Sequence, residues 1–245
     1  LGCAEGAVAP VADRSLALAS LGEAELVLRS TAGFVPRLVV HAPRASEAPA
    51  SAGLEAGSHL VTGGNGGLGL LTGRGLAEHG ARSLVLASRR GALAPGTEAE
   101  WSQLRSSGVP SVVERCDTSE VADVRRIAGR ATPPLAGVWH AAGVLADAVL
   151  LEQSATKFAH VYAPKAQGAL ALQLATARMP LGVCMFFSSV SALLGGAGQA
   201  NYSAANACLD ALGAHCRVLA RPAVSVQWGA WAEVGMAARG AASER

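Results

Sequence analysis

Four polar residues in the second half of the chain have the types and the spacing that the reduction of a carbonyl group requires. Tyr202 follows Ser189 by thirteen positions, Asn206 follows Tyr202 by four, and Lys165 lies 37 positions before Tyr202. A phenol can donate a proton to a carbonyl oxygen that a serine hydroxyl also holds, and an amide can complete a proton relay. A free tyrosine has a pKa of about 10, and a nearby lysine cation favours the phenolate. We therefore expect Lys165 to lower the pKa of Tyr202 towards neutral pH.

A glycine-rich segment lies well before these residues, between a short apolar run at 59–62 and a helical pattern that extends to about residue 79. Its glycines fit both the GxGxxG and the TGxxxGxG spacing. Such glycines allow a tight turn and let the backbone approach a pyrophosphate at the helix N-terminus. A purely structural turn is the alternative, but the strand before the turn and the helix after it favour a dinucleotide site. The segment consists of Thr62, Gly63, Gly64, Asn65, Gly66, Gly67, Leu68 and Gly69.

The end of the second predicted strand indicates which dinucleotide would bind. The chain there reads Ser88-Arg89-Arg90, where an enzyme that uses NAD usually has an acidic residue for the ribose hydroxyls. Arginines suit a 2′-phosphate, because their guanidinium groups form bidentate, charge-assisted hydrogen bonds. We therefore predict NADPH rather than NADH as the cofactor. The alternative is a pair of solvated arginines at a strand end.

Two further strand ends contribute to the predicted cofactor site. Asp117 follows the third strand and could accept a hydrogen bond from the adenine amine, although a helix N-cap would look the same. The small residues Ala141, Ala142 and Gly143 follow the fourth strand and would let the cofactor lie close to the backbone. His140, just before them, is more readily interpreted as a structural residue than as a catalytic one.

Strands and helices alternate along most of the chain. Strands are expected at 59–62, 83–87, 111–114, 135–140, 182–187 and 223–227, and helices after the glycine turn and at about 97–106, 119–129, 156–177 and 199–219. This alternation predicts an α/β fold with a doubly wound parallel sheet. Residues 1–42 suggest short strands, and the Ala-, Ser- and Pro-rich segment 43–57 reads as a linker.

Composition narrows the class of protein. With 245 residues, 51% hydrophobic and 16% charged, the chain can bury a large aliphatic core. Its net charge of +2 argues neither for nor against a polyanionic partner, and we expect no nucleic-acid or membrane partner. The five cysteines show no zinc spacing, so we expect free thiols in a reducing compartment and no metal. The chain start lacks a signal-peptide pattern, which favours a cytoplasmic location.

Several stretches in combination resemble the ketoreductase domain of modular (type I) polyketide synthases, within the short-chain dehydrogenase/reductase superfamily. They are TGGNGGLG, LVLASRRG, VWHAAGVLAD, PKAQGA, FFSSVSALLGGAGQANYSAANACLDAL and VQWGAWAEVGMA, and they fall within residues 58–237. The reductase of animal fatty acid synthase is a near neighbour. Most short-chain reductases have a lysine four positions after the tyrosine, where this chain has Asn206. In the ketoreductase family the lysine comes from the preceding helix, as Lys165 would.

The resemblance implies a Rossmann-type fold and the NADPH-dependent reduction of a β-keto thioester bound to an acyl carrier protein, in polyketide or fatty acid biosynthesis. Tyr202 would protonate the developing alkoxide, Ser189 would hold the same oxygen, and Lys165 would also bind the nicotinamide ribose. Residues 1–42 would be the end of a structural subdomain, and 58–245 a catalytic domain truncated at its C-terminus, with other domains of the same synthase around it. A non-catalytic or epimerising module and a free-standing reductase are the alternatives.

The resemblance also bears on stereochemistry. Family members that form the D-alcohol carry Leu-Asp-Asp after the fourth strand, where this chain has Leu145-Ala146-Asp147. Members that form the L-alcohol usually carry a tryptophan eight positions before the tyrosine, and that residue here is Leu194. We therefore expect a D-configured alcohol, without α-epimerisation because Ala197 replaces a diagnostic proline. The substrate and stereocontrol residues are then Asp147, Leu194, Gln199 and Met236.

Overall fold

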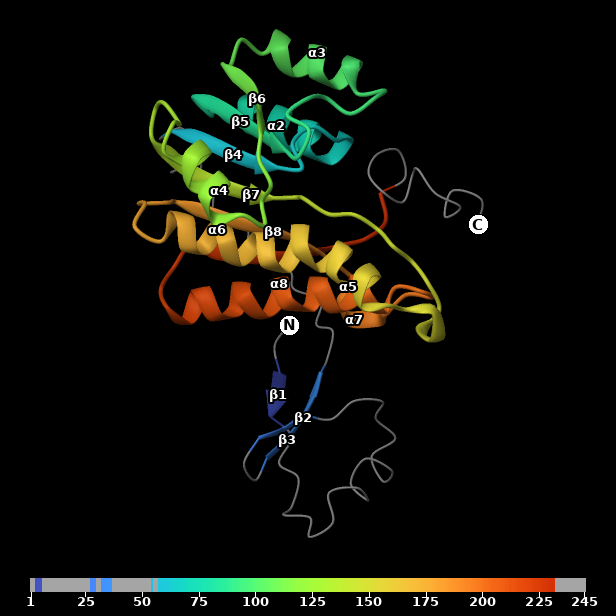
Figure 1. Cartoon of the computed structure of the whole chain (residues 1–245). Helices are drawn as coiled ribbons and strands as arrows, with labels where there is room; N and C mark the ends of the chain where they lie inside the picture. The colour runs from blue at the N-terminus through green and yellow to red at the C-terminus, as the bar shows by residue number, and fades with distance from the viewer. Residues whose placement is uncertain (1–2, 6–26, 30–31, 37–53, 55–56, 232–245) are drawn as a thin grey trace. The chain divides into compact units, whose positions relative to one another are not determined.

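A computed structural model describes residues 3–5, 27–29, 32–36, 54 and 57–231 of the chain (Figure 1). The chain divides into two compact units, Leu1–Pro49 and Ala50–Arg245. In the smaller unit, β1 (Cys3–Glu5), β2 (Val27–Arg29) and β3 (Ala32–Pro36) form an antiparallel sheet in the order β1-β3-β2. Most of the predicted linker at 43–57, and Met236 near the end of the chain, lie outside the described residues.

The larger unit is built on a parallel sheet with the strand order β6-β5-β4-β7-β8-β9. This is the order of a doubly wound Rossmann fold, so the predicted fold class is confirmed. The strands are β4 (Ser58–Thr62), β5 (Ser83–Ser88), β6 (Ser111–Arg115), β7 (Leu135–His140), β8 (Val183–Ser189) and β9 (Ala223–Trp228).

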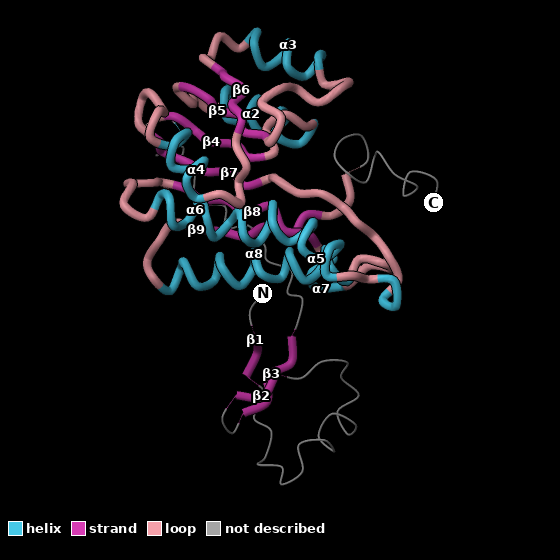
Figure 2. Tube along the Cα trace, viewed as in Figure 1, coloured by secondary structure: helices cyan, strands magenta, loops and turns pink. Residues whose placement is uncertain are grey.

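Helices cover both faces of this sheet (Figures 1 and 2). Side chains alternate between the faces, since Leu60 packs into the first layer of helices on one face and its neighbour Val61 packs into the second layer on the other face. Phe186, Leu172 and Leu209 are fully buried in the first layer. The helices are α2 (Gly67–Glu78), α3 (Glu98–Ser106), α4 (Val121–Ala128), α5 (Ala155–Tyr162), α6 (Gly168–Thr176), α7 (Ser191–Leu194) and α8 (Ala200–Val218), with a 3₁₀ turn at Leu150–Glu152.

The strand order reverses between β4 and β7, which pair directly with Thr62 opposite His140. Parallel strands end at the same edge, and ligands of such folds bind outside the carboxyl ends of the strands at this switch point. The glycine turn, Arg89 and the 141–143 segment follow the carboxyl ends of strands, and Ser189 is the last residue of β8. The topology therefore brings the predicted cofactor and catalytic segments to one edge of the sheet.

One predicted helix differs from the structure in a way that matters for the site. The continuous helix expected at 156–177 is divided into α5 and α6 by a π-helical segment, Ala163–Gln167, which contains Lys165. Single π-helical turns are frequent at functional sites and have no simple sequence signal. Within the part of the chain that the structure describes, none of the helices combines the length and the apolar character needed to span a membrane.

Candidate active site

The structure gathers the four residues of the predicted catalytic group at the carboxyl end of β8. Tyr202 and Asn206 lie one turn apart on α8, and Ser189 is the last residue of β8. Lys165 is almost completely buried, and its Nζ donates to the backbone oxygen of Phe187 at 2.9 Å and to Asn206 Oδ1 at 2.8 Å. Asn206 Nδ2 in turn donates to the backbone oxygen of Tyr202 at 2.9 Å. The amide thus links the lysine to the helix turn that carries the phenol.

The two neighbouring serines have different surroundings. Ser188 is buried, and its hydroxyl donates to the backbone oxygen of Asn206 at 3.2 Å. Ser189 is only partly buried, and its Oγ accepts from the backbone N–H of Ser191 at 3.2 Å. Ser188 is therefore committed to holding α8 against β8, whereas the Ser189 side chain is hydrogen-bonded to the Tyr202 phenol and lies beside the proposed general acid.

The electrostatic state of Tyr202 differs from the expectation. Lys165 Nζ lies 5.2 Å from the centre of the Tyr202 ring. Burial nevertheless raises the pKa of Tyr202, with Asp147 acting in the same direction, while the side chains of Asn206 and Ser189 act in the opposite one. The predicted lowering of this pKa by Lys165 is therefore wrong for this structure, because the loss of solvation by water outweighs nearby polar groups.

Lys165 is itself strongly affected by burial. Loss of solvation lowers its pKa to about 7, although the negative charge of Asp210 acts to raise it. Asp210 lies one turn beyond Asn206 on α8, and it accepts hydrogen bonds from Ser225 at 2.6 Å and Gln227 at 2.8 Å. A lysine with a pKa near 7 exchanges its proton at physiological pH. Nothing in the sequence spacing alone indicated this role of Asp210.

The glycine turn fits the backbone approach that a dinucleotide requires. Gly63 has φ +67°, and a Cβ there would lie 2.9 Å from the backbone of Ala141 and Ala142. A Cβ at Gly69 would come within 2.5 Å of Gly64 Cα, so this glycine lets α2 pack onto the turn. Around Gly66 the nearest protein atom to such a Cβ is 3.7 Å away, which leaves that side of the turn open. Two glycines thus serve packing, and the third faces space where a ligand could approach.

The start of α2 suits an anion. Gly66 is its N-cap, no side chain caps the first backbone N–H groups, and the first turn contains no acidic residue. The N-terminus of a helix carries a partial positive charge and free N–H donors, which together bind phosphate groups. Asn65 holds the turn against the loop that follows β5, because its Nδ2 donates to the backbone oxygen of Ala92 at 2.9 Å. The residues present therefore fit the pyrophosphate of a nicotinamide dinucleotide.

The strand end beside the turn presents two exposed cations. Arg89 and Arg90 directly follow β5 and both are exposed. Ser88 is buried instead, and its hydroxyl accepts from the Gly91 backbone N–H at 3.1 Å, which closes the turn that displays the arginines. Ser88 thus has a structural function, while the guanidinium groups are free to meet a phosphate.

The remaining predicted cofactor residues lie on neighbouring strand ends. Asp117 is not the N-cap of α4, which is Glu120. Its Oδ1 accepts from the backbone N–H of Ser119 at 3.0 Å and from the Ser119 hydroxyl at 2.6 Å, so the carboxylate closes a local turn. Ala142 lies against the glycine turn, with its N–H directed to Thr62 Oγ1 at 3.4 Å, and Ala141 and Gly143 are partly buried beside it.

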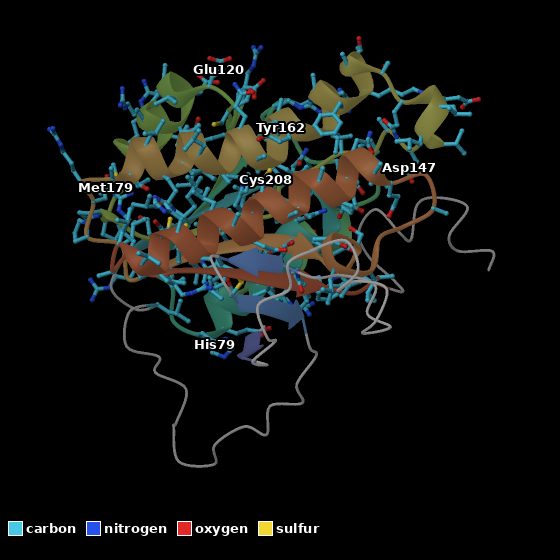
Figure 3. The ribbon with its side chains drawn as sticks, turned by 90° about the horizontal axis from the view of Figure 1, so that it is seen from below. His79, Glu120, Asp147, Tyr162, Met179 and Cys208 are labelled. Carbon is cyan, nitrogen blue, oxygen red and sulfur yellow. The ribbon has the colours of Figure 1, made fainter. Side chains whose placement is uncertain are left out.

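The loop after β7 is tied to the start of α8, where Tyr202 lies. Gln199 Nε2 donates to Asp147 Oδ2 at 3.1 Å, and Asn201 Nδ2 donates to the backbone oxygen of Ala146 at 2.9 Å. Leu194, at the end of α7, is 72% exposed, so its side chain is open to a ligand or partner. Figure 3 shows Asp147 at the opposite end of the unit from Met179. Asp147, Leu194 and Gln199 therefore border the catalytic end, and the role of Asn201 was not predicted.

Comparison with known proteins identifies the family. The family model for the KR domain matches residues 57–233. The chain belongs to the ketoreductase (KR) domain family. It is 46% identical over 228 residues to polyketide synthase GfsB of Streptomyces halstedii, covering 91% of this chain and 4% of that protein. It is 39% identical over 178 residues to erythronolide synthase EryA2 of Saccharopolyspora erythraea, covering 72% of this chain and 5% of that protein. These relatives are large multidomain synthases of which this KR domain matches a small part.

Solved structures agree with this assignment. A structure of A-type ketoreductases from a modular polyketide synthase superposes with a TM-score of 0.84 and 38% identity, covering 91% of this chain and 47% of that one. A C2-type ketoreductase from a modular polyketide synthase superposes with a TM-score of 0.78 and 30% identity, covering 94% and 49%. The KR chain thus spans about half the length of these solved ketoreductases, and the resemblance read from its motifs is confirmed.

Proposed function

We propose that this KR domain reduces a β-keto thioester, carried by an acyl carrier protein, to a β-hydroxy thioester with NADPH. The observation that carries the proposal is the buried Lys165 ammonium, held by Asn206 and the Phe187 backbone within 5.2 Å of the Tyr202 ring. Burying a lysine is costly, so its retention next to a phenol favours a chemical function over a structural one.

In this proposal, the bound nicotinamide supplies the hydride. Tyr202 donates a proton to the carbonyl oxygen, and the Ser189 hydroxyl holds the same oxygen during the transfer. The raised pKa keeps the phenol protonated before the reaction. Lys165 and Asn206 lie on the path by which a proton would return to Tyr202, since Lys165 Nζ donates to Asn206 Oδ1 and the Asn206 side chain also acts on the Tyr202 phenol.

The proposed cofactor site uses the turn from Thr62 to Gly69 for the pyrophosphate and Arg89 and Arg90 for a 2′-phosphate. The exposure of both arginines and the absence of an acidic residue from Ser88-Arg89-Arg90 at the end of β5 support NADPH. Asp117 stays proposed for the adenine, since its Oδ2 is not needed for the turn that Oδ1 closes.

We also propose how the domain is placed and what alcohol it forms. Residues 58–245 would be the catalytic part, 43–57 a linker and 1–42 the end of a structural subdomain, within a synthase that presents the substrate on its carrier protein. The hydrogen bond between Asp147 and Gln199 supports a fixed position for the Asp147 loop near Tyr202. Together with Leu194 in place of tryptophan, this contact supports a D-configured alcohol. Solved relatives described as A-type and as C2-type have TM-scores of 0.84 and 0.78, so overall fold does not distinguish these classes.

The test is the oxidation of NADPH in the presence of a β-keto acyl thioester, compared between the wild type and Tyr202→Phe. Loss of the general acid is expected to lower kcat by about 10²–10⁴-fold while NADPH binding persists. Ser188→Ala is the matched control, because this serine neighbours Ser189 but its hydroxyl serves the backbone of α8. Near-normal turnover of Tyr202→Phe would exclude the proposed acid. NADPH binding without turnover by the wild type would favour a non-catalytic module.

A further inference from the structure

His140 is a fully buried residue to which the proposed reaction assigns no function. It is the last residue of β7, and it lies directly opposite Thr62 of β4 in the sheet. Its Nε2 lies 2.8 Å from the backbone oxygen of Lys165, and its Nδ1 lies 2.7 Å from Thr62 Oγ1. The imidazole therefore bridges the residue that opens the glycine turn and the backbone of the proposed catalytic lysine.

The chemistry of these partners fixes the direction of each bond. A backbone oxygen only accepts, so Nε2 must carry the ring proton, and in the neutral ring Nδ1 must then accept from the Thr62 hydroxyl. Thr62 Oγ1 in turn faces the backbone N–H of Ala142 at 3.4 Å. A single directed chain thus runs from Ala142 through Thr62 and His140 to Lys165. Burial lowers the pKa of His140 to about 4, consistent with a neutral ring.

The surroundings leave the ring little freedom. Phe186 meets it edge-on, with ring centres 6.3 Å apart and planes at 89°. Gly168 follows the π-helical segment, and a Cβ there would lie 3.2 Å from His140 Cε1 and 3.0 Å from Thr118 Oγ1. The glycine therefore lets the segment that carries Lys165 approach the ring closely enough for the 2.8 Å bond.

We infer that His140 is a positioning residue, which holds the π-helical backbone at Lys165 against the end of β4 and so sets where the Lys165 ammonium stands. The inference rests on the proposed function for its kinetic consequence but not for its geometric one. Single π-helical turns are rare overall but frequent at functional sites, and this one accepts a hydrogen bond from outside the helix at the Lys165 carbonyl. His140 is thus hydrogen-bonded both to Thr62, where the glycine turn begins, and to the backbone of Lys165.

The chain provides a matched control near the amino end of β4, the strand that pairs with β7. His59 of β4 is also fully buried, its Nε2 lies 2.8 Å from the backbone oxygen of Leu54, and its Nδ1 accepts from Trp139 Nε1 at 3.2 Å. His59→Asn therefore removes the same type of donor from a backbone carbonyl. It does so at the amino end of the sheet, away from the catalytic residues.

The first measurement requires no cofactor. The chain has only two lysines, Lys157 and Lys165, so protein labelled with ¹³C-lysine gives two Cε–Hε signals in an NMR spectrum. Lys165 lies close enough to the Tyr202 ring for its signal to carry a ring-current shift. We expect His140→Asn and Gly168→Ala to move the Lys165 signal towards that of Lys157. In contrast, His140→Gln, whose amide can still donate to the Lys165 carbonyl, should leave it in place.

The second measurement is steady-state kinetics of the same proteins. We expect His140→Asn to lower kcat by about tenfold or more, with KM for the thioester changed less than about twofold, because misplacing a catalytic group by 1 Å costs up to about 10²-fold. His140→Gln should recover most of this loss, and His59→Asn should lower thermal stability without lowering kcat.

Failure of the inference and failure of the proposed function give different results. An unshifted Lys165 signal in His140→Asn, or an equal shift in His59→Asn, overturns the positioning role whatever the activity. A wild-type protein that binds NADPH without reducing the thioester refutes the proposed function, and the NMR comparison still decides whether His140 places Lys165.

Discussion

Substitution of Gly66 by alanine separates the fold of the glycine turn from its proposed binding of a dinucleotide. Gly66 has φ −98° and ψ 169°, a conformation that alanine adopts, and the nearest atom to an added Cβ is 3.7 Å away. The free energy of unfolding should then fall only by the effect of a poorer N-cap, which is about 1 kcal/mol. For a domain of this size, that corresponds to about 2–4 °C in Tm. A methyl group on the open side would nevertheless occupy space that a pyrophosphate needs. We expect NADPH to bind at least about tenfold more weakly, which is about 1.4 kcal/mol.

Two other glycines calibrate this comparison. At Gly63, the positive φ alone costs alanine about 1–2 kcal/mol, and backbone atoms 2.9 Å away add to it, so Gly63→Ala should lower both Tm and affinity. At Gly75, inside α2, no atom lies within 4 Å of an added Cβ, and Gly75→Ala should stabilise the protein by about 0.5–1 kcal/mol. Fluorescence titration with NADPH and thermal melting measure the two quantities. Unchanged affinity in Gly66→Ala would refute the placement of the pyrophosphate on this turn.

Three further outcomes follow from the same structure. Arg89→Ala should remove most of the preference for NADPH over NADH in a titration, and equal affinities in the wild type would refute the proposed 2′-phosphate contact. The product from a β-keto thioester should be mainly the D-alcohol by chiral chromatography, and a mainly L product would refute the assignment based on Asp147. The folded-state pKa of His140 is about 4 and its ordinary value 6.5, so below pH 6.5 the unfolded chain binds a proton that the native chain excludes. Stability from this group should therefore decrease by about 3 kcal/mol as the pH falls from 6.5 to 4, and urea unfolding of His140→Gln should lack that decrease.

The sequence was sufficient to predict the architecture because hydrophobic periodicity and turn residues are local signals. Apolar runs such as 59–62 and 135–140 became adjacent parallel strands, and the helix after the glycine turn begins where the glycines end. The spacing of Ser189, Tyr202 and Asn206 predicted their common location, since a strand end and the first turns of a long helix bring them together.

The sequence could not predict features that depend on burial or on contacts between distant segments. The π-helical turn at Lys165 arises where α5 and α6 meet the end of β7, and a helical pattern looks the same with or without it. The direction of the Tyr202 pKa depends on how much water the fold removes, which residue spacing does not report. The Asp117 carboxylate likewise closes a turn instead of capping α4, because Ser119 lies two residues beyond it.

The two altered pKa values favour one direction for the proposed relay. Burial raises the pKa of the Tyr202 phenol above its ordinary value and lowers that of the Lys165 ammonium to about 7. The phenol is therefore fully protonated at neutral pH, as a general acid must be before it reacts. Once it has given up its proton, the phenolate is a much stronger base than the Lys165 amine. Transfer of a proton from the Lys165 ammonium to the phenolate is then downhill, and the Asn206 side chain, which accepts from Lys165 and acts on the phenol, lies between the two groups. The same loss of solvation that opposes a low tyrosine pKa thus drives the step that restores the acid.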